Sequence, residues 1–296
     1  MKEKNKIKGI ILAGGYGSRL YPLTWGVSKH LLPVYDKPMI YYPLSVLMEA
    51  GINEILIISK IDDLHNYQNL FKNGSHLGLK ISYKIQQKPN GIAESFTIAS
   101  DFIGNDNVCL ILGDNIFHGK FIIDKISLAK KNLAKNYSSI FGVEVNNPKD
   151  FGVIEYDNSG RILNIIEKPS FPKSKMIVSG LYFYNNEVVN FSKKLKPSSR
   201  GELEITDINN IFLSKGKLKL IKLNNKTSWI DTGTFSSLIK ASKYFEDYEL
   251  LTNKKVACIE ELAFKMGYID KKKLIKIASE MKNSDYGKYL FNLVNN

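Results

Sequence analysis

Short apolar runs alternate with amphipathic stretches through the first half of the chain. Runs typical of strands lie at residues 7–13, 54–59, 80–86 and 107–113. Patterns typical of helices lie between them, at residues 39–50 and 91–102. Continuous apolar strands that alternate with helices are typical of a sheet covered on both faces. The pattern therefore predicts an α/β fold with a doubly wound, mainly parallel, Rossmann-like sheet, whose ligands bind at the carboxyl ends of the strands.

The pattern changes in the second half of the chain. Residues 151–167 contain two alternating runs on either side of the sequence DNSG, which is typical of a β-hairpin. A further apolar strand is predicted at residues 176–184, and the segment RGELEITD, at residues 200–207, is expected to lead into a helix that ends at about residue 213. From residue 253 the pattern is helical to the end. We therefore expect an inserted hairpin and a C-terminal helical appendage.

The composition limits the broad class of protein. The chain has 296 residues and is 44% hydrophobic, which is enough for one large core. No run approaches the ~20 apolar residues that a bilayer span requires, and the start has no apolar segment of signal-peptide form. Cys109 and Cys258 are too few for a disulfide framework and favour buried thiols in a reducing cytoplasm. We expect a cytoplasmic protein with no membrane partner.

The net charge of +13 raises the hypothesis of nucleic-acid binding. The lysines are dispersed, however, and no zinc-finger, helix-turn-helix or aromatic RNA-binding signature accompanies them. The charge therefore favours a solvated basic surface, and we expect no nucleic-acid partner.

The most informative stretch is GGYGSRLYPLTWGVSK, at residues 14–29, which directly follows the first apolar run. Glycines after a buried strand allow backbone N–H groups to hold phosphate oxygens. The dinucleotide fingerprint is excluded because Leu20 stands where its third glycine belongs, and no segment matches the phosphate loop G-x-x-x-x-G-K-[ST]. The glycines alone are equally compatible with a tight turn. The positive charges of Arg19 and Lys29 favour binding of a nucleoside triphosphate.

Two aspartates follow predicted strands. Asp114 comes directly after the strand at 107–113, and Asp231 stands in WIDTGT, after a short apolar segment. Each could be an ordinary helix cap. Beside a triphosphate site, the two carboxylates predict a Mg²⁺ site, because Mg²⁺ is usually held by one or two carboxylates plus substrate phosphates.

Seven motifs in order and spacing resemble a known family. They are GGYGSRLYPLT with the following SK, LLPVYDKPMIYYPLS, LGDN, EKP, GLYFY, RGELEITD and WIDTGT. Over nearly its whole length the chain resembles the sugar-1-phosphate nucleotidyltransferases, and among them the glucose-1-phosphate thymidylyltransferases. The resemblance implies a Mg²⁺-dependent reaction in which dTTP and glucose 1-phosphate give dTDP-glucose and pyrophosphate, the first step of dTDP-rhamnose and other dTDP-sugar biosynthesis. The sugar phosphate attacks the α-phosphorus in line, so no enzyme nucleophile is needed.

The resemblance also implies roles for five charged residues. Arg19 would contact the β- and γ-phosphates, and Lys29 would bridge the triphosphate and the charge of the transition state. Asp114 and Asp231 would hold Mg²⁺, and Lys168 would bind the sugar phosphate. The alternative for Lys168 is a solvated strand end, which is usual for an isolated lysine.

The resemblance further implies two sets of lining residues. Those on the nucleotide side would be Leu12, Gly14, Gly15, Gly17, Ser18, Gln86 and Gly91. Those on the sugar side would be Asn115, Gly152, Glu167, Lys168, Val178 and Tyr182. Gln86 could instead be a solvated strand end, and Val178 and Tyr182 could be core residues.

Four positions depart from the usual pattern of the subgroup. His30 and Glu94 each stand where Gln is usual, Phe151 where Tyr is usual, and Ile92 where Leu is usual. None belongs to the charged set. They affect the expected preference for nucleobase and sugar and leave the expected reaction unchanged.

The resemblance implies a catalytic domain at 1–250, with a nucleotide part at about 1–115 and a sugar part at about 116–235. The segment 251–296 would serve assembly into a homotetramer and feedback regulation through a second nucleotide site. The alternatives are an enzyme that uses UTP or another sugar 1-phosphate, and a non-catalytic sugar-nucleotide sensor. A sensor is expected to lack one of the five charged residues, and all five are present.

Overall fold

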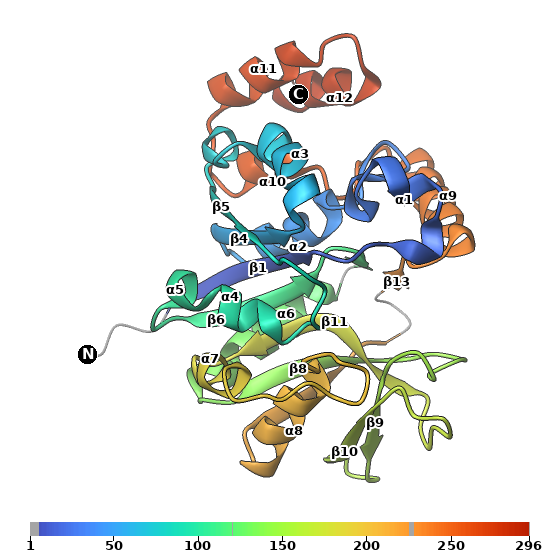
Figure 1. Cartoon of the computed structure of the whole chain (residues 1–296). Coiled ribbons are helices and arrows are strands. Elements are labelled where there is room, and N and C mark those ends of the chain that lie inside the picture. The colour runs from blue at the N-terminus through green and yellow to red at the C-terminus, as the bar shows by residue number, and fades with distance from the viewer. Residues whose placement is uncertain (1–5, 120, 225–227, 296) are drawn as a thin grey trace.

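The computed structural model describes residues 6–119, 121–224 and 228–295 and is built around a nine-stranded mixed sheet (Figure 1). Seven strands follow the order β10-β9-β11-β6-β1-β4-β5, and β8 pairs with both β11 and β12. The strands of this sheet are β1 (Ile7–Ala13), β4 (Glu54–Ser59), β5 (Lys80–Ile85), β6 (Asn107–Leu112), β8 (Ser138–Glu144), β9 (Gly152–Tyr156), β10 (Ile162–Glu167), β11 (Met176–Tyr184) and β12 (Leu218–Lys222).

Strand direction divides the sheet. The strands β6, β1, β4 and β5 are parallel neighbours, so their carboxyl ends lie at one edge. Strand β11 runs antiparallel to β6, β8 and β9. The predicted fold class is confirmed, and every antiparallel pair of the large sheet contains a strand of the segment 152–184.

Two small sheets lie outside the large one. Strands β2 (Pro33–Val34) and β3 (Lys37–Pro38) form a short hairpin. Strands β7 (Asn115–His118) and β13 (Ser228–Asp231) pair antiparallel, with Asp231 opposite Asn115. This second pairing brings a late segment of the chain beside the carboxyl end of β6.

Helices cover both faces of the sheet. They are α1 (Leu23–Gly26), α2 (Tyr41–Glu49), α3 (Ile61–Phe71), α4 (Glu94–Ile98), α5 (Ser100–Ile103), α6 (Ile122–Ala134), α7 (Glu187–Ser192), α8 (Ile205–Ser214), α9 (Phe235–Thr252), α10 (Ile259–Lys265), α11 (Lys271–Glu280) and α12 (Asp285–Asn295). Short 3₁₀ turns are η1 (Ser18–Leu20), η2 (Lys29–Leu31) and η3 (Ser75–Leu77).

Strand β1 shows why the sheet is buried on both faces. Ile11 belongs to the core that also contains residues of α2, α3, α6 and α10. The next residue, Leu12, belongs to a second core with residues of α4, α7 and α8. Because successive side chains of a strand point to opposite faces, the continuous apolar run of β1 supplies both cores.

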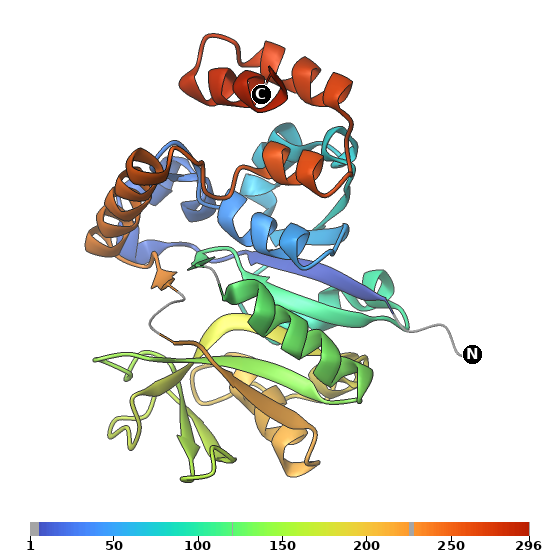
Figure 2. The same cartoon turned by 180° about the vertical axis from the view of Figure 1, so that it is seen from behind.

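The C-terminal helices pack on the first of these cores. Figures 1 and 2 show α11 and α12 in red at the end of the molecule opposite the β9–β10 hairpin, with α10 between them and α2. Ile259 of α10, Leu274 of α11 and Leu290 of α12 are buried in the same cluster as Leu47 of α2. Within the described residues, no helix combines the length and the apolar character needed to cross a membrane.

The predicted elements agree with the structure in position, with two differences. The helix predicted at 91–102 is divided into α4 and α5, because Ala99 has φ −85° and ψ 3° and leaves α-helical geometry for one residue. The strands β2, β3, β7, β8 and β12 and the helices α1, α3, α6 and α7 were not predicted. The hairpin, the strand at 176–184 and the helical end of the chain are confirmed.

Candidate active site

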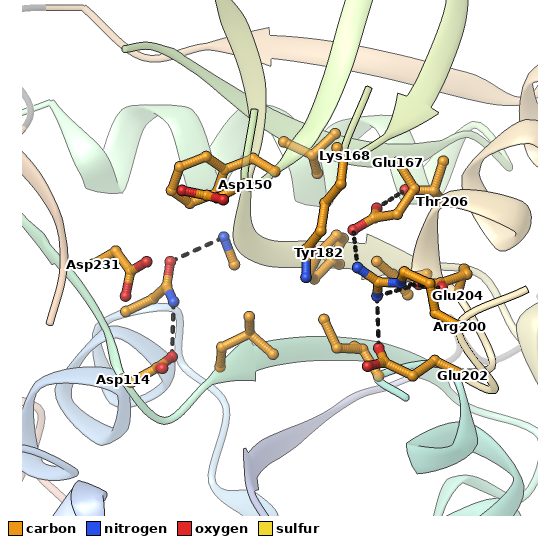
Figure 3. Close-up of a pocket in the computed structure, with 18 of the residues that line it drawn as sticks. Asp114, Asp150, Glu167, Lys168, Tyr182, Arg200, Glu202, Glu204, Thr206 and Asp231 are labelled. Carbon is orange, nitrogen blue, oxygen red and sulfur yellow. Dashed lines mark hydrogen bonds and ion pairs between the residues drawn. The ribbon is translucent and has the colours of Figure 1, made fainter. Parts of the chain in front are cut away.

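A cavity of about 220 Å³ opens at the carboxyl edge of β6, between this edge, the β9–β10 hairpin and the start of α8 (Figure 3). We call it the main cavity. Most of the side chains that line it are charged or polar, so it suits a polar ligand rather than an apolar one. The lining residues are Arg19, Ile92, Leu112, Asp114, Asn115, Asp150, Phe151, Gly152, Glu167, Lys168, Val178, Gly180, Tyr182, Arg200, Glu202, Glu204, Ile205, Thr206, Trp229 and Asp231.

A second cavity, of about 200 Å³, lies over the glycine loop, and we call it the loop cavity. It shares Arg19 and Asp114 with the main cavity, so the two cavities adjoin at these side chains. Gly17 has φ 64°, a left-handed conformation that glycine adopts without steric cost, and it precedes η1. The lining residues are Gly15, Gly17, Ser18, Arg19, Leu20, Lys29, His30, Asp114 and Gly233.

Lys29 and Asp114 form the central ion pair. Lys29 Nζ donates to Asp114 Oδ2 at 2.5 Å, and Asn115 Nδ2 donates to Asp114 Oδ1 at 2.9 Å. Burial acts to raise the pKa of Asp114, but the charges of Lys29 and His30 and these two hydrogen bonds outweigh it and hold the pKa well below its usual range. Asp114 is therefore ionised at any physiological pH.

Asp231 reaches the same place from β13. Thr232, the next residue, links the end of β13 to the segment after β6, because its Oγ1 donates a hydrogen bond to the Asp114 backbone oxygen at 2.8 Å. Asp231 Oδ1 is buried and has no hydrogen-bond partner among the described residues. Burial, and then the charge of Asp114, raise the pKa of Asp231. Two adjacent carboxylates with an unsatisfied buried oxygen suit a bound cation.

Two carboxylates alone do not complete the coordination of a divalent cation, so a bound ligand would have to supply further oxygen atoms. The described residues contain no group of three or more His, Cys, Asp or Glu side chains that could hold a metal ion. Mg²⁺ is characteristically bound by one or two carboxylates together with substrate phosphates and water. Asp114 and Asp231 match that donor set.

Arg19 lies beside this carboxylate pair. A Cβ placed on Gly233 would stand 2.7 Å from Arg19 Nη2 and 3.0 Å from Asp231 Oδ1, so a side chain there would displace the guanidinium group from this position. Sequence reasoning did not select Gly233, although it belongs to the motif WIDTGT. The sequence feature that could have indicated Gly233 is its place two residues after Asp231, a candidate metal ligand.

Lys168 enters the main cavity from the end of the hairpin. Figure 3 shows its side chain directed into the space between Asp231 and Arg200. Its φ of 42° is unusual for a residue with a side chain, and its backbone N–H donates to the Phe151 oxygen at 3.0 Å. Lys168 Nζ makes no ion pair within the part of the chain that the structure describes. Its charge is therefore available to a ligand.

A carboxylate cluster forms the far wall of the main cavity. Thr206 Oγ1 donates to Glu167 Oε2 at 2.5 Å, and burial raises the pKa of Glu167. Arg200 donates to Glu202 at 2.7 Å and through Nε and Nη2 to Glu204 at 3.1 and 3.2 Å. This network orients carboxylates that could accept hydrogen bonds from hydroxyl groups.

Sequence reasoning missed Arg200, Glu202, Glu204 and Thr206. All four belong to RGELEITD, which was interpreted only as a helix entry and as part of the resemblance. The sequence feature that could have indicated them is a group of charged residues just before a helix, since three of the first five residues of this motif are charged.

Asn115 bridges two strands at the base of the cavity. Its Oδ1 accepts hydrogen bonds from Trp229 Nε1 at 2.7 Å and from the Gly180 N–H at 3.2 Å. Gly152, Val178 and Tyr182 line the same cavity. Val178 is 7% exposed and Tyr182 3%, so both are also core residues.

The remaining residues expected on the nucleotide side lie at neighbouring strand ends. In the described part of the chain, Leu12, Gly14, Gln86 and Gly91 do not line either cavity. Gln86 nevertheless approaches Gly14, because a Cβ on Gly14 would lie 2.5 Å from Gln86 Oε1. Gly91 has φ 108° and allows the backbone of Leu203 to approach closely.

Three of the four unusual positions line the two cavities: Ile92 and Phe151 line the main cavity, and His30 lines the loop cavity. His30 is buried, and its Nδ1 lies 3.2 Å from Ser28 Oγ and 3.3 Å from Tyr67 Oη. Phe151 packs against Trp229 with ring centroids 5.7 Å apart at the wall of the main cavity. A tyrosine there would add a hydroxyl beside the cavity.

The parallel sheet with a glycine loop, two cations and paired carboxylates at its carboxyl edge defines a protein that handles nucleoside phosphates. The family model described as nucleotidyl transferase matches residues 8–248. The chain belongs to this family.

Its relatives within the family carry a more specific name. The glucose-1-phosphate thymidylyltransferase of Neisseria meningitidis is 48% identical over 289 residues, which cover 97% of this chain and 99% of the relative. That of Mycobacterium tuberculosis is 46% identical over 288 residues, which cover 97% and 99%.

Solved structures agree with the fold. A Bacillus anthracis protein provisionally assigned the same activity, in complex with sucrose, superposes with a TM-score of 0.74 at 41% identity. The match covers 81% of this chain and 95% of that protein. A UDP-glucose pyrophosphorylase complexed with UDP-glucose has a TM-score of 0.72 at 24% identity over 82% of this chain and 100% of that one, which shows the fold alone.

Proposed function

We propose that the chain transfers a thymidylyl group from dTTP to glucose 1-phosphate, with Mg²⁺, giving dTDP-glucose and pyrophosphate. The observation that carries the proposal is the convergence of Arg19, Lys29, Asp114, Lys168 and Asp231 on two adjoining cavities. The identity of about 48% to glucose-1-phosphate thymidylyltransferases over nearly the full length supports the choice of substrates.

The arrangement supports a single in-line displacement. A sugar phosphate in the main cavity, held by Lys168, would present an oxygen to the α-phosphorus of a triphosphate that lies across the loop cavity. The backbone N–H groups of Gly15 and Gly17 and the guanidinium group of Arg19 would hold the departing pyrophosphate. The phosphate oxygen of the sugar is already ionised, so no general base is required, and catalysis depends on positioning and on charge neutralisation.

Asp114 and Asp231 would hold the Mg²⁺ ion. When bound, Mg²⁺ neutralises phosphate charge and fixes the phosphate oxygens in one geometry. Lys29 keeps Asp114 ionised and, from its buried position, would add positive charge beside the α-phosphate. The unpartnered Oδ1 of Asp231 supports this assignment because an ionised, buried oxygen without a partner is costly.

The other residues of the expected nucleotide and sugar sets would select the two substrates. Asn115, Gly152, Glu167, Val178 and Tyr182 would surround the hexose. Leu12, Gly14, Gln86 and Gly91 would surround the nucleoside, and Ser18 would lie at the phosphates. Their positions at one edge of the sheet support these roles.

The experiment is a pyrophosphate-release assay with purified protein and Mg²⁺. Each of dTTP, UTP, dCTP and dATP is paired with glucose 1-phosphate and with other sugar 1-phosphates. The pair dTTP and glucose 1-phosphate should give the highest kcat/KM. Thymine and uracil differ by one methyl group, which discriminates by about 10- to 200-fold, and UTP differs from dTTP also by its ribose 2′-hydroxyl group, so the preference for dTTP over UTP reports both differences. Absence of pyrophosphate release with every pair would overturn the proposal.

We also propose a cytoplasmic homotetramer, with 1–250 as the catalytic domain and 251–296 serving assembly and feedback regulation. The apolar side chains that α9 exposes support assembly: Ile239 is 69% exposed, Leu250 68% and Leu251 85%. Light scattering at micromolar concentration should give about four times the mass of the chain, and a monomer would contradict the assembly.

A further inference from the structure

Gln86 is a buried polar side chain that follows β5, beside the glycine loop. It is 3% exposed, and its Oε1 points at Gly14, where an added Cβ would lie 2.5 Å away. Strands β1, β4 and β5 are parallel neighbours, so Gly14 and Gln86 both lie at the ligand-binding edge. The side chain therefore borders the surface where the proposed function places the nucleobase.

The chemistry of its neighbours fixes which way the Gln86 amide points. Gln86 Nε2 donates to Glu94 Oε2 at 2.8 Å and to the Gly91 backbone oxygen at 3.3 Å. A backbone carbonyl and an ionised carboxylate only accept hydrogen bonds. The nitrogen of Gln86 must therefore face these two partners, and its oxygen must face Gly14. A reversed amide would place oxygen against oxygen twice.

Glu94 is itself held in place. Asn90 Nδ2 donates to Glu94 Oε1 at 2.9 Å, so each carboxylate oxygen accepts from a different amide. Of the described residues, none donates a hydrogen bond to Gln86 Oε1. A ligand donor can therefore use that oxygen.

We propose that Glu94 is a positioning residue that presents Gln86 Oε1 to the nucleobase and thereby selects bases with an imino N–H. Thymine and uracil carry a hydrogen on N3 and can donate it to Oε1. Cytosine carries a lone pair on N3, so two acceptors would meet and neither would be satisfied. The inference rests on the proposed function, because that function places the base against Gly14 and Gln86.

The test compares dTTP with dCTP in the same enzyme preparation. In Glu94→Leu the acceptor is lost and the amide of Gln86 can turn, so the ratio of kcat/KM for dTTP over dCTP should fall about tenfold. In Glu94→Gln an oxygen still accepts from Gln86 Nε2, so the ratio should stay within about threefold of the wild-type ratio. Glu280→Leu, on the exposed surface of α11, is the matched control and should leave the ratio unchanged.

The ratio is independent of how much of each variant folds, because both nucleotides meet the same active fraction. An unchanged ratio in Glu94→Leu would overturn the inference, and so would an equal loss in Glu94→Leu and Glu94→Gln. Both results leave the proposed function intact as long as the wild-type enzyme releases pyrophosphate from dTTP and glucose 1-phosphate. A wild-type enzyme without that activity overturns the proposed function itself.

Discussion

At the residue scale, the charged set was predictable because each member follows a strand or belongs to a loop of distinctive composition. Arg19, Lys29 and Asp114 were selected from their places after apolar runs, and the structure brings them together. Arg200 and Gly233 were not selected, because their importance depends on partners far away in the sequence. Arg200 contacts Glu167 at 4.0 Å, and Gly233 makes room for Arg19.

The role of Asp114 gives the first prediction. Asp114→Asn preserves shape and the contact with Asn115 but removes the charge that would hold Mg²⁺. The kcat for dTDP-glucose formation should fall by about a thousandfold or more at saturating Mg²⁺. Asp101→Asn, on the surface helix α5, is the matched control and should retain the wild-type kcat. Full turnover in Asp114→Asn would refute the metal role.

His30 gives a prediction about pH. Burial lowers the pKa of His30 to about 4, against about 6.5 in the unfolded chain. Between these values the unfolded state binds more protons, so the contribution of His30 to stability is complete above pH 6.5 and is lost as the pH falls toward 4. His30→Gln should reduce this pH dependence by on the order of 1–3 kcal/mol, measured by urea unfolding at several pH values. Parallel wild-type and variant curves would contradict the assignment.

At the element scale, local patterns predicted strands and helices well and pairings poorly. The apolar runs of β1 and β4 were predicted to the residue, because buried strands carry their signal locally. The pairing of β7 with β13 was not predictable from periodicity. Each strand has only four residues, and Asp231 lies far along the chain from its partner Asn115. That pairing positions one of the two proposed metal ligands.

A buried ion cluster connects the loop elements to the C-terminal segment. Lys37 of β3 contacts Asp36 and lies 3.2 Å from Glu249 of α9, and its side chain is 1% exposed. Lys255 contacts the same two carboxylates, at 3.1 Å in the case of Glu249. Two lysines and two carboxylates therefore form one ion cluster. It joins the β2–β3 hairpin to α9 and to the segment that follows α9.

Removal of one member should be costly. Lys37→Met leaves the buried carboxylate of Glu249 and the partly exposed carboxylate of Asp36 to share Lys255, so the free energy of unfolding should fall by about 3–5 kcal/mol, measured by urea denaturation. The matched control is Lys243→Met on α9, where Lys243 pairs with Glu246 on the exposed surface and its loss should change little. Equal stability of Lys37→Met and wild type would show that the cluster does not stabilise the fold.

At the scale of the whole molecule, the sheet class and the helical tail followed from the pattern of apolar residues. The mixed direction of the sheet did not, because β8, β9 and β11 form long-range antiparallel pairs whose partners no local pattern specifies. Their consequence is functional. They place the hairpin that precedes Lys168 across the cavity from Asp114, which follows β6, and Asp231, which ends β13 (Figure 3).

The central claim is that one sugar phosphate oxygen attacks the α-phosphorus directly, without a covalent intermediate on the protein. It is tested most directly by the reaction of dTTP that carries a single sulfur of known configuration on the α-phosphorus, with the product analysed by ³¹P NMR. A single in-line displacement between the main cavity and the loop cavity predicts inversion of configuration at phosphorus. Retention would require two displacements through a nucleotidylated side chain and would contradict the account.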